Sequence, residues 1–235
     1  HRGTMARSSG KWYWEAIGDD VRESSQGGRF GFTGTDTKTK GGIEDTPYSM
    51  EWHPSQGIVK FVGTTRTIID ASATYVDGDV LALALDLDNN IAYWYKNGSL
   101  ESTQDFTSDS ADGTRDFAPW VYNGSGGSPN WWYNFGADSS FAGTKTAKGN
   151  QDGNDIGDFY YTPPTGFLAL CTSNLPEPAV IPSENFNAII YTGNATDDRN
   201  ITGVGFESNF SWIKSRNTTN DHLLFDSVRG VGKYL

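Results

Sequence analysis

The sequence predicts an all-β fold, in which short antiparallel strands pack as a sandwich. Apolar and aromatic residues recur at a period of two in short runs, and no amphipathic helical pattern of ten or more residues interrupts them. The chain has 8 Trp, 11 Tyr and 13 Phe, enough rings to fill a large core. We expect less than about a tenth of the residues to be helical, against roughly one third in typical globular proteins.

The clearest predicted unit is a hairpin that begins at Asp79. Leucine occupies every second position from Leu81 to Leu87, and smaller residues lie between, so one face of this strand is leucine-rich. Residues 88–90 can adopt the positive φ angles of a tight turn, and 91–95 form the returning strand. Asn97-Gly98 is a strong signal for a further turn.

Similar alternation predicts the remaining strands. They are 11–15, 29–33, 57–62, 66–69, 117–122, 131–135 and 166–171, followed by 186–191, 210–214 and 222–225. The polar segments 99–116 and 137–157 are interpreted as loops, and His53 as part of a turn. Prolines from residue 176 to 182 predict an extended linker at 173–185, between a domain at 1–172 and a β-rich segment at 186–235. That segment is expected to be the start of a further domain and to be too small to fold alone.

Composition and charge exclude several classes of partner. A net charge of −11 repels phosphate backbones, so we expect no nucleic-acid binding. No apolar run approaches the roughly 20 residues of a membrane span, so no membrane insertion is expected. Cys171 is the only cysteine, which excludes an intrachain disulfide and is typical of a small buried hydrophobic residue.

Several motifs in order resemble the SPRY domain, and together they span about residues 1–172. They are Gly10–Glu15 (GKWYWE), Phe30–Phe32, Gly78–Val80 with Leu85–Asp88, Tyr95–Gly98, Phe117–Pro119 and Asn134–Gly136. The resemblance implies an antiparallel SPRY-like (concanavalin-like) β-sandwich, here with a short C-terminal β extension. It also implies that loops at one edge bind partners, although it assigns no ligand residue.

The C-terminal part is similar to large marine bacteriophage proteins in which a SPRY-like domain precedes a concanavalin-like domain of unknown function. The similarity lies in residues 163–176, 191–194, 201–206, 212–216 and 225–230. It implies a non-enzymatic virion structural or adhesion protein, such as a tail fibre, spike or capsid decoration, made in the host cytoplasm. Other virion proteins, and a host surface glycan or protein, are the expected partners of a homo-oligomer. Both ends are expected to be interior to a longer polypeptide.

Two other functions remain alternatives: a polysaccharide-degrading glycosidase of a phage appendage, and an intracellular SPRY protein-interaction adaptor. A glycosidase needs two carboxyl groups about 5 to 10 Å apart. Asp86 and Asp88 share a strand face at about 7 Å, but aspartate at the end of a hairpin is favoured for local hydrogen bonding. No catalytic residue is therefore assigned, and we expect no enzyme activity.

The candidate ligand-binding residues surround a polar, glycine-rich connection. They are Tyr122, Asn123, Asn130, Trp131 and Trp132. Adjacent tryptophans on a strand point to opposite faces, so one is expected in the core and the other outward, where it can stack on a sugar. An ordinary strand connection is the alternative interpretation.

A calcium loop is the candidate metal site, and no other cofactor is expected. Oxygen-bearing side chains occur at Asn150, Asp152, Asn154 and Asp158, which is the one-three-five-nine spacing of calcium loops. Asp155 stands where such loops need glycine, and no bidentate glutamate follows. The alternative is a solvated acidic turn.

Overall fold

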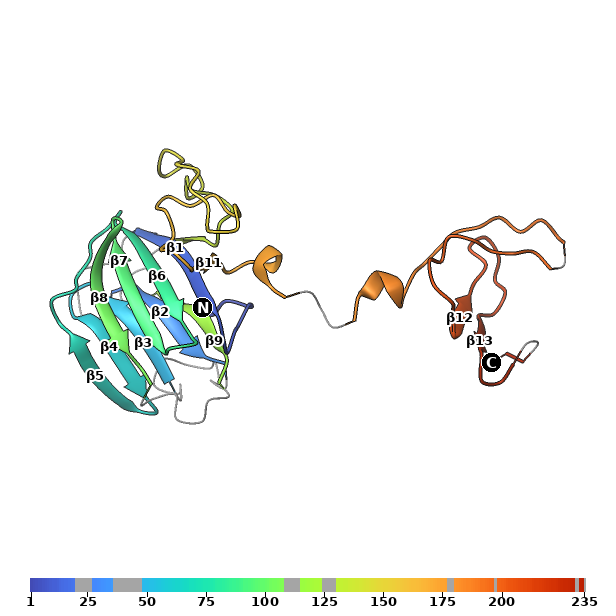
Figure 1. Cartoon of the computed structure of the whole chain (residues 1–235), viewed down its shortest axis with the longest axis horizontal. Helices are drawn as coiled ribbons and strands as arrows, with labels where there is room; N and C mark the ends of the chain where they lie inside the picture. The colour runs from blue at the N-terminus through green and yellow to red at the C-terminus, as the bar shows by residue number, and fades with distance from the viewer. Residues whose placement is uncertain are drawn as a thin grey trace. The chain divides into compact units, whose positions relative to one another are not determined.

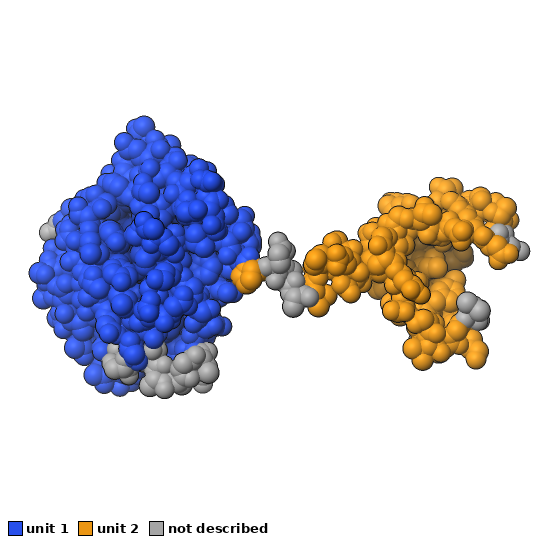
Figure 2. Space-filling model, in the orientation of Figure 1, with its two compact units in different colours: residues 1–175 blue, residues 176–235 orange. Residues whose placement is uncertain are grey.

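A computed structural model describes residues 1–19, 27–35, 48–107, 115–123, 130–176, 180–196, 198–230 and 233–234. The chain forms two compact units, His1–Leu175 and Pro176–Leu235 (Figure 2). The first unit is a sandwich of two mainly antiparallel sheets (Figure 1), so the predicted all-β fold is confirmed. Within the described ranges the only helical elements are two 3-10 turns, Thr172–Asn174 and Pro182–Glu184. None of the described helical segments is long and apolar enough to cross a bilayer.

The first sheet has the strand order β10-β1-β6-β7-β8, and the short strand β11 pairs in parallel with β1. Its strands are β1 (Lys11–Asp19), β6 (Val80–Asp86), β7 (Ile91–Lys96), β8 (Ser99–Asp105), β10 (Asn130–Asn134) and β11 (Leu168–Ala169). The hairpin β6–β7 pairs Leu83 with Trp94, as the period-two pattern leads one to expect. β1 lies in the middle of the sheet because both β6 and β10 pair with it.

The second sheet has the order β5-β4-β3-β2-β9. Its strands are β2 (Arg29–Gly34), β3 (Tyr48–His53), β4 (Gly57–Val62), β5 (Thr65–Asp70) and β9 (Phe117–Tyr122). The first residues of the chain run along the outer edge of β9. Gly3 donates its backbone amide to Pro119 at 2.8 Å, and Arg7 exchanges two backbone hydrogen bonds with Phe117. This segment covers the β9 edge, which would otherwise expose unpaired backbone groups.

The core lies between the two sheets. The leucines of β6 and the alternating aromatic residues of β1, β2 and β3 all point into it. Trp94 is fully buried and makes edge-to-face contacts with Trp52 at 5.9 Å and Phe30 at 6.4 Å between ring centroids. Burial of a large ring stabilises the fold by about 2 kcal/mol or more, so these aromatic contacts form the main packing of the sandwich.

Four sequence-based expectations about local structure are wrong. The polar segment expected to be a loop contains β8, because backbone pairing with β7 across the Asn97-Gly98 turn outweighs its polar composition. β3 was not predicted, although Tyr48, Met50 and Trp52 alternate toward the core. His53 ends β3 and is fully buried rather than part of a turn. The strand expected at 166–171 is limited to β11.

The second unit contains one two-stranded sheet, formed by β12 (Phe210–Ile213) and β13 (Leu223–Asp226). The strand expected at 186–191 is wrong: these residues form no strand, and Phe186 is 77% exposed. Trp212 and Val228 are 65% and 94% exposed. Every buried hydrophobic residue in the described part of the chain belongs to the first unit, so the described part of the second unit contains no apolar core.

Candidate ligand-binding site

The two adjacent tryptophans of β10 lie on opposite faces of the sheet. Trp131 points inward, where it stacks on Phe30 with ring centroids 6.4 Å apart and an interplanar angle of 20°. Trp132 points outward and packs against Ile17 and Val80, the residues of β1 and β6 that lie nearest to it on that face. Both side chains are half-buried. Trp132 is therefore the one that a ligand can reach from outside the sandwich.

Two aromatic residues from a distant loop, Tyr160 and Tyr161, pack against the same buried cluster as Trp132, and both are half-buried. The two tyrosine rings meet edge to face, with centroids 5.0 Å apart and an interplanar angle of 73°. We call Trp132, Tyr160 and Tyr161 the aromatic shelf. Its base is the buried apolar cluster of Ile17, Val80 and Phe141. A partly exposed aromatic surface on a packed apolar base is typical of binding sites.

A buried carboxylate holds the backbone of the shelf. Glu15 of β1 is fully buried and accepts hydrogen bonds from the backbone amides of Tyr160 at 2.8 Å and Tyr161 at 2.7 Å. The Asn134 side-chain amide and the Tyr13 hydroxyl complete its shell, each at 3.1 Å. Burial raises the pKa of Glu15, and these hydrogen bonds oppose that rise. The two tyrosines are thus attached to β1, an interior strand of the first sheet.

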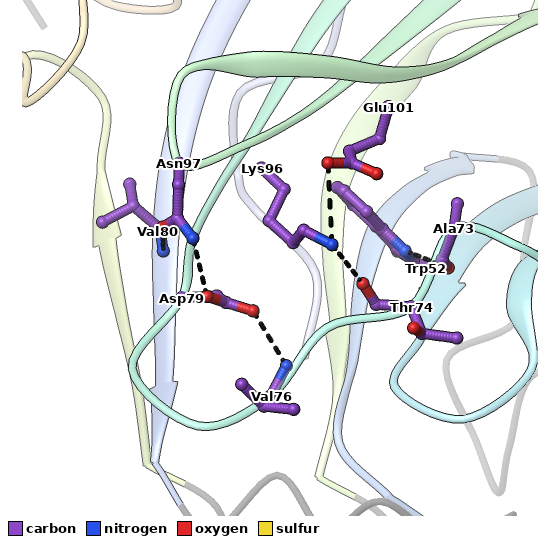
Figure 3. A network of polar contacts seen from close by, with 9 residues as sticks. All are labelled: Trp52, Ala73, Thr74, Val76, Asp79, Val80, Lys96, Asn97 and Glu101. Atoms are coloured by element: carbon purple, nitrogen blue, oxygen red, sulfur yellow. Dashed lines mark hydrogen bonds and ion pairs between the residues drawn. The ribbon is translucent and has the colours of Figure 1, made fainter.

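The turn between β7 and β8 supports the Tyr161 ring. A Cβ atom on Gly98 would lie 2.7 Å from that ring, so the ring rests directly on the glycine. Asn97 has a φ of 50°, and its side chain donates to Asp79 at 2.7 Å and accepts from the Val80 amide at 3.0 Å (Figure 3). Asparagine tolerates this left-handed conformation, which explains the strength of the Asn-Gly signal.

The same network holds the loop that precedes β6. The Lys96 ammonium donates to the Thr74 carbonyl at 2.9 Å and lies 3.6 Å from the Glu101 carboxylate (Figure 3). The Trp52 indole donates to the Ala73 carbonyl at 2.6 Å. The contacts of Lys96 and Trp52 therefore hold this loop in place, and the hydrogen bond between Asn97 and Asp79 connects the loop to the β7–β8 turn.

The polar ends of the shelf are open to solvent. The hydroxyl groups of Tyr160 and Tyr161 and the indole N–H of Trp132 make no hydrogen bond within the described part of the chain, and none of these atoms is buried. Desolvation and the neighbouring Tyr160 raise the pKa of Tyr161. The Lys148 ammonium lies 5.7 Å from the Tyr160 ring centroid. The shelf thus offers flat rings together with unused donors and acceptors.

The other predicted ligand residues lie in a different environment. Tyr122 ends β9 opposite Arg29, whose guanidinium lies 4.8 Å from the Tyr122 ring centroid. Arg29 also pairs with the fully buried Glu51 at 3.0 Å. Burial raises the pKa of Glu51 to about 7, and the charge of Arg29 opposes that rise. The Asn123 side-chain oxygen is buried and has no partner among the residues that the structure describes.

The five predicted ligand-binding residues thus lie in three different environments. Tyr122 and Asn123 contact or adjoin the Arg29 side of the second sheet, Trp131 is in the core, and Asn130 is exposed at the start of β10 on the strand of Trp132. The loop at 124–129 that joins them lies outside the described residues. Sequence analysis missed Tyr160 and Tyr161. The only local signal was a pair of adjacent tyrosines after the acidic loop.

The candidate calcium residues make hydrogen bonds that hold their loop together. Asp152 accepts backbone hydrogen bonds from Asn154 at 2.9 Å and Ala169 at 2.8 Å, which ties the loop to β11. Asn150 donates to the Tyr160 carbonyl at 2.9 Å, and Asn154 to the Asn174 side chain at 2.9 Å. The remaining candidate, Asp158, has one buried side-chain oxygen without a partner. No group of three His, Cys, Asp or Glu side chains suited to a metal occurs in the described ranges, and the calcium site stays a prediction.

Asp86 and Asp88 also have structural partners. The Asp86 carboxylate lies 2.9 Å from the Lys11 ammonium and accepts from the Asn89 side chain at 2.8 Å. Asp88 accepts from the Gly10 backbone amide at 2.8 Å. Both carboxylates therefore hold the β6–β7 turn to the start of β1.

Comparison with known proteins relates the two units to different groups. A family model described as a domain of unknown function (DUF7483) matches residues 181–235. No curated protein matches the chain. The sandwich is similar to SPRY domains.

Three solved structures are similar to the chain, each with a TM-score of 0.39 over 55% of it, and two of them are SPRY domains. The SPRY domain of human HERC1 is 14% identical, with 77% of that chain covered. The TRIM65 PSpry domain is 13% identical, with 67% covered. Stonustoxin is 12% identical, with 21% covered.

Proposed function

We propose that the β-sandwich is a non-catalytic binding module of a virion structural or adhesion protein, and that it binds its ligand on the aromatic shelf. The observation that carries the proposal is the attachment of Tyr160 and Tyr161 to the buried Glu15, on the apolar cluster that also supports the outward-facing Trp132. Rings held in place before binding lose little entropy when a ligand arrives. Their solvent-facing polar ends supply the hydrogen bonds that orient it.

The virion part of the proposal rests on the sequence resemblance of the C-terminal part to phage proteins. In that setting the ligand is a glycan or protein of the host surface, other virion proteins are neighbours, and the chain is a homo-oligomer. Electron microscopy of virions labelled with an antibody to this chain tests the location. Label on a tail, fibre or capsid supports it, and label absent from intact and disrupted particles overturns it.

Substitution of Trp132 tests the binding site. We expect Trp132→Ala to lower the adhesion of the full chain to host cells more than tenfold, since the loss of a central aromatic contact costs about 2 kcal/mol. Leu100→Ala is the matched control, because Leu100 is 52% exposed on β8 and lies outside the shelf. Circular dichroism checks that both variants fold. Unchanged adhesion of a folded Trp132→Ala variant would overturn the proposed site.

A further inference from the structure

The chemistry of the aromatic shelf indicates a class of ligand, an inference that rests on the proposed function. We infer that the shelf takes an uncharged pyranose sugar, whose ring stacks on Trp132 and whose hydroxyl groups bond to the polar ends of Tyr160 and Tyr161. Three features of the site carry this inference: ring faces, unused polar atoms and balanced charge.

The ring faces match the apolar side of a sugar. A pyranose ring presents C–H groups on one face, and these carry slight positive charge that the negative face of an aromatic ring attracts. Trp132 offers the largest such surface of the shelf, and its packing on Ile17 and Val80 prevents it from collapsing away from the ligand. Tyr160 and Tyr161 meet at 73°, so their rings form an angled wall rather than a second parallel face.

The polar atoms match hydroxyl groups. The Trp132 indole only donates, whereas each tyrosine hydroxyl both donates and accepts. All three groups are unpaired and open to solvent in the described part of the chain. A sugar hydroxyl also donates and accepts, so neighbouring hydroxyls satisfy this mixed set without leaving a buried group unpaired. The exposed Asn130 amide on the same strand adds another donor and acceptor.

The charges around the shelf favour a neutral ligand. Lys148 lies over Tyr160, whereas the carboxylates of Asp79 and Glu15 both act on Tyr161 and raise its pKa. Charges of both signs therefore lie at the site, so a charged ligand of either sign meets a like charge there. The net charge of −11 over the whole chain opposes anionic sugars and phosphates at longer range.

A proline-rich peptide is the main competitor, because aromatic grooves also bind polyproline helices. Such grooves are lined by ring faces that run along the peptide. The edge-to-face pair of Tyr160 and Tyr161 places one ring across that path, which favours a compact ring as ligand. The experiment below makes decaproline one of its arms.

The test measures binding of the full chain to immobilised neutral oligosaccharides of glucose, galactose, mannose and N-acetylglucosamine. Polygalacturonate and decaproline are the anionic and peptide arms. We expect a neutral oligosaccharide to bind, Trp132→Ala to weaken it more than tenfold, and Trp132→Phe to restore part of the affinity. Tyr160→Phe and Tyr161→Phe remove only the hydroxyl groups and should each weaken binding several-fold, whereas Leu100→Ala leaves it unchanged.

A failure of the sugar inference and a failure of the proposed function give different results. If folded Trp132→Ala loses adhesion to host cells but no neutral oligosaccharide binds, or if only decaproline or polygalacturonate binds, the sugar class is wrong and the binding site stands. If Trp132→Ala binds cells as the parent does, the proposed function is wrong as well. Tight sugar binding that is insensitive to Trp132→Ala, Tyr160→Phe and Tyr161→Phe places the sugar elsewhere and overturns the inference.

Discussion

The buried carboxylate of Glu15 accepts a hydrogen bond of 2.7 Å from the backbone amide of Tyr161, 146 positions later in the chain. A second bond reaches the Tyr160 amide. Through these two bonds β1, an interior strand of the first sheet, holds the loop that carries Tyr160 and Tyr161, two of the three residues of the aromatic shelf. The ionised carboxylate has two acceptor oxygens, and each of them receives one backbone amide.

Glu15→Gln should release this loop. Glutamine replaces one acceptor oxygen with an NH2 group, which faces a backbone N–H and leaves it unpaired in a buried site. We expect a loss of about 2 kcal/mol in the free energy of unfolding, measured by urea denaturation, together with weaker ligand binding. Glu207→Gln is the control, because Glu207 is exposed and lies in the second unit, outside the shelf and its supporting contacts. A Glu15→Gln variant as stable as the parent would show that the carboxylate does not anchor the shelf.

The pair of Glu51 and Arg29 should make stability depend on pH. The pKa of Glu51 is about 7 in the fold and about 4.3 in an unfolded chain, because burial penalises the charged form. Between these values the folded protein holds a proton that the unfolded chain has lost. Stability from this group is therefore greatest at low pH and falls as the pH rises from about 4.5 to 7.

The measurement compares the parent with Glu51→Gln, which cannot titrate. We expect the parent to lose on the order of 1–3 kcal/mol more than the variant between pH 5 and pH 8 in urea denaturation. Glu15 also has a raised pKa, but it remains in both proteins and cancels in the comparison. If the free energy of unfolding changes equally with pH in the two proteins, this would contradict a raised pKa of Glu51 in the fold.

Gly31→Ala should disrupt the second sheet. A Cβ atom at Gly31 would lie 2.1 Å from the Met50 carbonyl oxygen and 2.8 Å from the Glu51 Cα, both backbone atoms of the neighbouring strand. The strands would have to separate, so we expect a loss of about 3 kcal/mol or more, or no folding at all. Gly153→Ala is the matched control, because nothing lies within 4 Å of its added Cβ. Thermal unfolding that is unchanged in Gly31→Ala would contradict this close approach of β2 and β3.

The two units should differ in their ability to fold alone. Residues 1–175 contain all the buried hydrophobic side chains of the described chain, so this piece should unfold cooperatively on heating. Residues 176–235, or the shorter segment 186–235, should show no cooperative transition, because an isolated two-stranded sheet is marginal in water. Circular dichroism during a thermal scan measures both. A sigmoidal transition in the C-terminal piece would contradict the prediction.

Local alternation was enough to predict most strands of the sandwich. The leucines of β6 and the paired aromatics of β1 and β7 repeat at period two, and a strand can bury such a pattern on one face only. The same geometry placed Trp131 and Trp132 on opposite faces. It failed for β8, where a polar edge strand forms because β7 supplies its backbone partners.

The shelf and the buried charges depended instead on contacts between distant residues. Tyr160 and Tyr161 pack on the same apolar cluster as Trp132 because their backbone amides bond to Glu15, and no pattern in the sequence around residues 160 and 161 encodes that partner. Glu51 looks like an ordinary polar residue of a strand, yet it is fully buried, and its pKa follows from that burial and from Arg29. Periodicity tells which side of a strand a residue occupies. Which residues meet on that side depends on how the chain closes its loops over the sheets.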